Sequence, residues 1–138
     1  MRNRDLASDH LRRAEARLRA LDVLYENRSW ADVVRESQEI VELTLKGLLR
    51  ACGVEPPRIH DVADVLLAER DRLPPAMAAH LERLAGISRA LRRDRELAFD
   101  GAEDLTPSSF YREADAVIAR DSARDVVAVV RPHVADPA

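Results

Sequence analysis

The chain has 138 residues, of which 46% are hydrophobic and 34% charged, as is typical of one compact domain. Aromatic content is only 4%, which favours an aliphatic helical core over a sheet. The net charge of −3 argues against a general polyanion-binding surface, and the single cysteine excludes an internal disulfide. No segment approaches the ~18 apolar residues of a membrane span, and the chain does not open on an apolar signal segment. We therefore expect a cytoplasmic protein that does not enter a membrane.

The first predicted helix spans about residues 4–26. Its apolar residues recur at spacings of three and four, which places them on one face: Leu11, Ala14, Leu18, Leu21 and Tyr25. Asn27 and Arg28 leave room for only a short turn before the next helix. So short a link predicts an antiparallel helical hairpin.

The most strongly patterned segment is 29–52, and we expect the other helices to pack around it. One face carries its apolar residues, which are Trp30, Val33, Val34, Ile40, Val41, Leu45, Leu48, Leu49 and Cys52. Ser29 and Asp32 resemble a capping box at its start. Gly53 suits the left-handed position that follows a helix, and the prolines at 56 and 57 prevent the helix from continuing.

Two further helices are predicted in the middle of the chain. His60 or Asp61 can cap a short helix that carries Val62, Val65, Leu66 and Leu67. A fourth helix starts near Pro75, a favoured first residue, and continues to about Phe99. Its inward face is formed by Leu81, Leu84, Ser88 and Leu91. Three arginines lie off that face and are expected in solvent: Arg89, Arg92 and Arg93.

The last predicted helix opens at Thr106 and Pro107 and stops before Pro132. Its apolar residues are Phe110, Ala114, Val117, Ile118, Val126, Val129 and Val130. Together the elements predict an all-α fold, an up-and-down bundle of four long helices and one short helix. We expect a single helical domain over residues 1–138, with its core at about 4–131 and a short disordered C-terminal tail.

Arg95 is the most informative single residue, because it continues the inward face of the fourth helix four residues after Leu91. An arginine that faces inward must be paired or must line a wet cleft, since an unpaired buried charge is costly. Glu42, Glu96 and Asp100 are candidate partners. The pattern leaves two interpretations open, a structural ion pair at the end of the bundle or a functional cleft.

Several familiar sites are absent from the sequence. There is no Glu-x-x-His pair for a di-iron site, no Cys-x-x-Cys, no phosphate-cradling glycine loop and no Gly-x-Ser-x-Gly turn. The four histidines are scattered, and each is better explained at a surface or a helix cap than as a metal ligand: His10, His60, His80 and His133. We therefore predict no metal site and no cofactor.

The sequence in and around the predicted helix at 29–52 resembles the HEPN family. Residues 38–49 (QEIVELTLKGLL), then Gly53, then residues 57–62 (PRIHDV) are similar to that family's helix, glycine and proline-containing loop ending in His-Asp. Residues 25–32 (YENRSWAD) resemble the family's entry to the same helix.

The resemblance continues downstream and covers residues 25–116. Residues 95–101 (RELAFDG) are similar to a run in one branch of the family, where an acidic loop and a tyrosine follow, here Tyr111. Members of this family are small helical bundles, often homodimers, and are commonly encoded beside a minimal nucleotidyltransferase as a toxin–antitoxin pair. The resemblance implies the same fold, a homodimer and such a partner for this chain.

Many HEPN proteins are metal-independent ribonucleases with an Arg-x4–6-His motif, in which histidine moves a proton and arginine stabilises charge on the phosphate. Arg95 fits the arginine position. The chain departs from the pattern after it, because four to six intervening residues lead to Asp100, Gly101 or Ala102, and none of these is histidine. An aspartate at 100 could accept a proton, but it would repel phosphate and lacks a near-neutral pKa.

Three functional hypotheses follow. In the first, the chain is a HEPN-like protein of a toxin–antitoxin or nucleotidyltransferase-associated system, and it binds a nucleotide, RNA or the nucleotidyltransferase. The binding cleft would then have Arg95 as its anchor and Tyr111 at its rim. Its shape would be set by Glu42, Glu96 and Asp100. In the second, it is a divergent ribonuclease toxin that uses Arg95 and an unrecognised proton carrier. In the third, it is a non-catalytic helical interaction module with a structural Arg95. The apolar segment 126–130 (VVAVV) lends some support to a homodimer.

Overall fold

A computed structural model describes residues 2–58, 61–100, 106 and 110–134, with the backbone alone for residues 2 and 94–100. Its long helices are α1 (Arg2–Glu26), α2 (Trp30–Ala51), α4 (Leu81–Asp100) and α6 (Glu113–Val134). The short helix α3 (Val62–Ala68) and two 3₁₀ turns, Arg70–Arg72 and Pro75–Met77, lie between α2 and α4. The described residues contain no strand. The predicted all-α bundle of four long helices and one short helix is confirmed.

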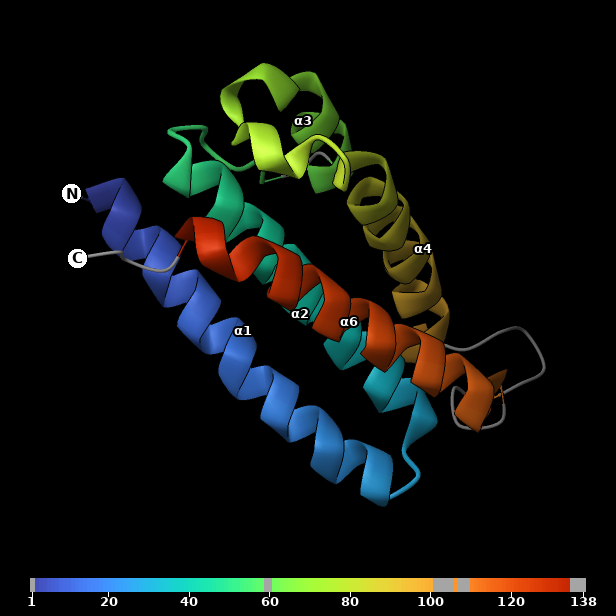
Figure 1. Ribbon diagram of the computed structural model, residues 1–138. Coiled ribbons are helices and arrows are strands. Elements are labelled where there is room, and N and C mark those ends of the chain that lie inside the picture. The colour runs from blue at the N-terminus through green and yellow to red at the C-terminus, as the bar shows by residue number, and fades with distance from the viewer. Residues whose placement is uncertain (1, 59–60, 101–105, 107–109, 135–138) are drawn as a thin grey trace.

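The long helices alternate in direction, and α2 lies at the centre of the bundle (Figure 1). α1 and α2 form the predicted antiparallel hairpin, α6 lies along both, and α4 contacts α2 far more than it contacts α6. The apolar face of α2 is almost completely buried, at Val33, Val34, Ile40, Val41, Leu45, Leu48 and Leu49. α1 begins and α6 ends at the same end of the bundle, which is also the end where α2 stops (Figure 1).

The two ends of α2 differ in how well the sequence predicts them. Gly53 has φ +76°, its N–H donates to the Arg50 carbonyl, and the Val54 N–H donates to the Leu49 carbonyl over 2.8 Å. This is a Schellman motif, and the predicted glycine stop is confirmed. The predicted capping box is wrong, because the Ser29 hydroxyl donates to the Asp32 carboxylate over 2.6 Å and caps no backbone N–H.

Between α2 and α4, the predicted cap of the short helix is confirmed, whereas the predicted start of α4 is not. Asp61 caps α3, since its carboxylate accepts from the Ala63 N–H over 2.9 Å. The start predicted for α4 at Pro75 is wrong: Pro75 opens a 3₁₀ turn, in which the Met77 N–H donates to Pro74 over 2.8 Å, and α4 begins only at Leu81. Pro74 and Pro75 supply no N–H, and this tighter turn carries Met77 into the core before α4 begins.

α6 buries a different face from the predicted one over its first half. Ala116, Ala119 and Ala123 are buried, whereas Phe110, Ala114 and Ile118 are exposed. Small side chains let α6 approach α2 closely, and that approach outweighs the larger apolar area of Ile118.

The predicted stop of α6 before Pro132 is also wrong, because the helix continues to Val134. A proline this close to the end removes one backbone hydrogen bond, and the buried side chains of Val130 and Val134 hold the turn on either side of it. Residues 135–138, where a disordered tail is predicted, lie outside the described residues. No helix within the described part of the chain is long and apolar enough to span a membrane.

Candidate functional site where α4 packs on α2

A polar ladder lies on α2 at a spacing of four residues. The Gln38 side-chain amide donates to the Glu42 carboxylate over 2.9 Å, and the Lys46 ammonium pairs with the same carboxylate over 3.0 Å. Residues four apart share one face of a helix, so the three side chains form a continuous row. Gln38 is buried, and Glu42 and Lys46 are half-buried.

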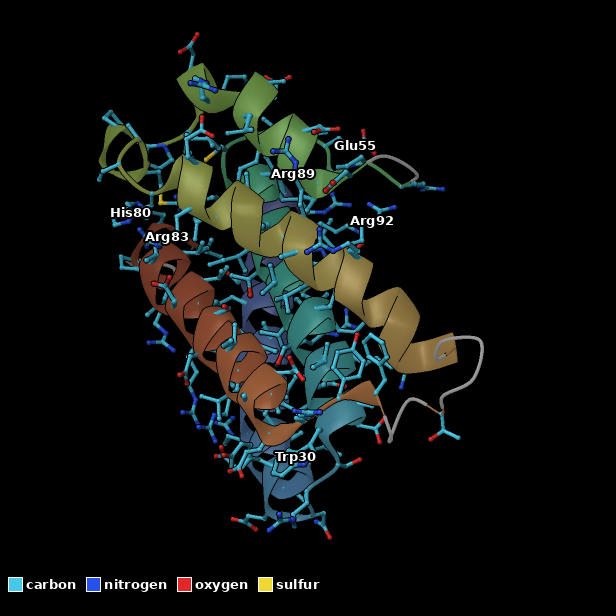
Figure 2. All side chains as sticks on the ribbon, turned by 90° about the vertical axis from the view of Figure 1, so that its right-hand side faces the viewer. Trp30, Glu55, His80, Arg83, Arg89 and Arg92 are labelled. Atoms are coloured by element: carbon cyan, nitrogen blue, oxygen red, sulfur yellow. The ribbon has the colours of Figure 1, made fainter. Side chains whose placement is uncertain are left out.

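α4 carries two arginines on the side near α3 and this row. Arg89 donates to the Asp64 carboxylate of α3 over 2.7 Å, and Arg92 lies one turn further along α4 with an exposed side chain. Figure 2 shows Arg89 and Arg92 on one side of α4, with His80 and Arg83 on the side nearer α6. The expected solvent exposure of these arginines is confirmed for Arg89, Arg92 and Arg93.

The charge of Arg92 affects the ionisation of Glu42 on α2. Burial alone would raise the pKa of Glu42, but the hydrogen bonds from Gln38 and Lys46, and the charges of Lys46 and Arg92, outweigh burial and leave that pKa lowered. Glu42 is therefore an anion at neutral pH, held between a cation of its own helix and a cation of α4. Such a carboxylate orders neighbouring donors and is poorly suited to take up a proton.

Gln38 contributes an acceptor that the fold leaves unused. Its side-chain oxygen is buried and has no hydrogen-bond partner among the described residues. A buried polar atom without a partner costs free energy, so a donor from a ligand or a neighbouring side chain would be stabilised there.

The remaining predicted site residues divide into two groups. Arg95, Glu96 and Asp100 belong to the last two turns of α4, and their side chains lie outside the described part of the structure. Tyr111 is described and is only 6% exposed, with its ring centroid 5.0 Å from that of Phe110, so the ring serves the packing of the core. Its position at the rim of a cleft stays a prediction.

Sequence reasoning named Glu42 but missed the side chains that hold it. Gln38 and Lys46 could have been found from their spacing of four residues on either side of Glu42. Arg92 could not, because its influence on Glu42 depends on how α4 packs on α2. Among the described residues, no group of three or more histidine, cysteine or acidic side chains could hold a metal ion.

The chain was compared with protein families, curated proteins and solved structures. The family model described as HEPN domain matches residues 7–132. No curated protein and no solved structure matches the chain.

Proposed function

The chain belongs to the HEPN domain family, and from this premise we propose that it binds the phosphate groups of RNA or a nucleotide through α4, as the HEPN component of a toxin–antitoxin or nucleotidyltransferase-associated system. It would do so without the Arg-x4–6-His site by which many members cleave RNA. Arg95 is the proposed anchor, with Glu42, Glu96 and Asp100 around it.

The observation that carries this proposal is the set of arginines on α4. Arg92 and Arg93 are exposed, and Arg95 follows two residues later. Arg89, one turn before Arg92, is also exposed but pairs with Asp64 over 2.7 Å, so it adds charge to this side of α4 without being the proposed contact. Guanidinium groups bind phosphate oxygens with paired hydrogen bonds. The negative charge of Glu42 acts on Arg92, which supports a defined position for the Arg92 guanidinium.

The absence of histidine after Arg95 supports binding rather than cleavage. A metal-independent ribonuclease needs a group that moves a proton near neutral pH, and Asp100 stands where the motif would place it. An ionised aspartate would also oppose the negative charge that grows on the phosphate in the transition state.

The test is binding of labelled single-stranded RNA and of nucleotides to the wild type and to Arg92→Ala and Arg95→Ala. Loss of one charge-assisted contact should raise the dissociation constant by about tenfold. Arg83→Ala is the matched control, because Arg83 is on the same helix but pairs with Asp125 of α6 over 3.0 Å. Equal weakening by Arg83→Ala, or no weakening by the other two variants, would contradict the proposal.

A ribonuclease that uses a proton carrier other than the motif's histidine is the second candidate. His10 is the histidine tested for this role, although it packs beside Gly47 where α1 crosses α2 and not on α4. His10 is half-buried beside basic residues, and burial together with the charges of Arg50, Arg13 and Lys46 lowers its pKa. A histidine that is neutral at pH 7 can accept a proton. Cleavage of cellular RNA by the wild type, lost in both Arg95→Ala and His10→Ala, would favour this candidate over binding alone.

Two expectations from the family remain part of the proposal, a homodimer and a minimal nucleotidyltransferase partner, together with the cytoplasmic location expected from the sequence. The segment 126–130 no longer supports a homodimer, because Val126, Val127 and Val130 are buried within the chain's own core. The partner is tested by co-expression with a nucleotidyltransferase from a neighbouring reading frame and co-purification of the two proteins. Arg95→Ala that leaves partner and ligand binding intact while lowering stability would favour a plain helical interaction module.

A further inference from the structure

A polar cavity lies at the end of the bundle where α1 begins and α2 stops. Its volume is about 410 Å³, and its lining residues come from α1, from the last turn of α2 and from the loop that follows: Asn3, Leu6, Arg50, Gly53, Glu55 and Arg58. Two of these side chains are cationic and one, Glu55, is a carboxylate. None of these lining residues belongs to the site described above on α2 and α4.

Further positive charge surrounds the cavity. Arg50, Arg13 and Lys46 act together on His10, whose pKa is lowered first by burial and then by these charges. Arg72 donates to the carbonyl of Gly53 over 2.9 Å, which places one more guanidinium beside the lining. Carboxylates lie in this corner too, since Asp9 opposes the effect of the cations on His10 and Glu69 pairs with Arg72 over 3.8 Å. The lining itself carries two arginines and one carboxylate, which gives it a net positive charge.

Arg50 is half-buried at the inner edge of this lining. Its Nε is buried and has no hydrogen-bond partner among the described residues. A basic residue in the last turn of α2 complements the helix dipole, which explains the charge at position 50. The dipole does not explain Arg58, which lies in the loop beyond the helix and lines the same cavity.

We propose that this cavity, hereafter the Arg50 cavity, binds a phosphate group of an RNA strand or nucleotide. The inference rests on the proposed function and adds a second phosphate contact to it. Arg50 and Arg58 would donate to the phosphate oxygens, and the side-chain amide of Asn3 supplies a further donor.

The position of the Arg50 cavity suits a ligand that also touches α4. Glu42, Lys46 and Arg50 follow one another at intervals of four residues on α2, so the row beside Arg92 leads toward the cavity. Eight residues of helix correspond to about 12 Å. Lys46 lies between the two positions with its ammonium paired to Glu42. The separation itself exceeds the size of one phosphate group, which suits a strand more than a single small anion.

Fluorescence anisotropy with a labelled single-stranded RNA, and separately with a labelled mononucleotide, distinguishes a strand from a free nucleotide. For the RNA, Arg50→Gln and Arg58→Gln should each raise the dissociation constant by about tenfold. Each should also reduce the slope of log affinity against log salt by about 0.7. An effect on the mononucleotide of the same size would assign the cavity to a nucleotide.

Arg12→Gln is the matched control, because it removes the same charge from α1 at a side chain that is 77% exposed and pairs with Asp9 over 3.1 Å. Thermal unfolding of each variant checks that it is folded, and Arg58, which is exposed in the loop after α2, provides a second variant outside the helices. Equal effects of Arg12→Gln and Arg50→Gln, or no effect of either cavity variant, would overturn the inference.

An independent probe separates failure of this inference from failure of the proposed function. In excess inorganic phosphate, compared with chloride at equal ionic strength, the amide NMR signals of Asn3 and Gly53 should shift, and Arg50→Gln should abolish the shift. If these shifts occur in a protein that binds no RNA, the Arg50 cavity is a phosphate site and the proposed RNA-binding function is wrong. If the signals do not shift, and RNA binding is lost in Arg92→Ala but not in the cavity variants, the proposed function holds and phosphate binding in the Arg50 cavity is wrong.

Discussion

The Tyr25 hydroxyl donates a 2.5 Å hydrogen bond to the carboxylate of Glu113, which joins the end of α1 to the start of α6 across 88 residues of sequence. The guanidinium of Arg120 lies 4.1 Å from the centre of the Tyr25 ring, and the Trp30 ring meets the same ring edge-on at 5.0 Å. These contacts close the bundle at the end opposite to the Arg50 cavity. Tyr25 therefore organises the turn between α1 and α2 and fixes where α6 begins.

Replacing Tyr25 with phenylalanine should lower the melting temperature while the ring contacts remain. The hydrogen bond to Glu113 is the first cause that raises the pKa of Tyr25 above 10.0. A group whose pKa is raised by folding stabilises the folded state below its unfolded pKa and loses that contribution as pH rises through its folded pKa. The difference in melting temperature between wild type and Tyr25→Phe should thus persist at pH 7 to 9 and shrink above pH 10. A difference that does not change over this range would show that the hydrogen bond is not its source.

Glu42→Gln should lower the free energy of unfolding at neutral pH by about 1 kcal/mol, the value expected for a half-exposed, charge-assisted contact. The substitution removes the pair with Lys46 and the charge facing Arg92. The pKa of Glu42 is lowered from 4.5, so its contribution is present above that pH and is lost as pH falls through the folded pKa. Urea unfolding at pH 7 and at pH 3 measures the change. A cost that is equally large at the acidic end would contradict an ionic origin.

The sequence predicts some parts of this fold well because one physical signal dominates there. On α2, large aliphatic residues lie on one face and charged residues on the other, so a single assignment of faces is possible. On α6, alanines and valines occur on several faces, and only close packing against α2 decides that Ala116 and Ala119 turn inward while Ile118 turns outward. The ladder around Glu42 was readable as local spacing, whereas the influence of Arg92 and the Arg50 cavity depend on segments distant in sequence.

Two glycine substitutions should differ in their effect on stability. Gly86 lies in the interior of α4 with no atom within 4 Å of where a Cβ would be, so Gly86→Ala should stabilise the protein by about 0.5–1 kcal/mol through a lower backbone entropy of the unfolded chain. At Gly47 a Cβ would lie 3.3 Å from both the Ala7 carbonyl oxygen and the His10 Cβ, where α1 crosses α2. Gly47→Ala should therefore stabilise less than Gly86→Ala, or destabilise. Chemical unfolding of both variants compares them directly, and the reverse order would contradict this account of the helix crossing.

If the expected homodimer forms, Ile118 is the side chain in the described part of the chain best placed to mediate it. Ile118 is 67% exposed and borders a hollow of about 290 Å³ between α4 and α6, which is lined also by Gly86, Ile87 and Ala90. In a two-fold dimer the same patch meets its own copy, so one substitution acts twice. Ile118→Asp should raise the dimer dissociation constant by roughly 100-fold, as for a central apolar contact. Val23→Asp is the control, since Val23 is 58% exposed on α1. Analytical ultracentrifugation that finds both variants equally dimeric would exclude this surface from the interface.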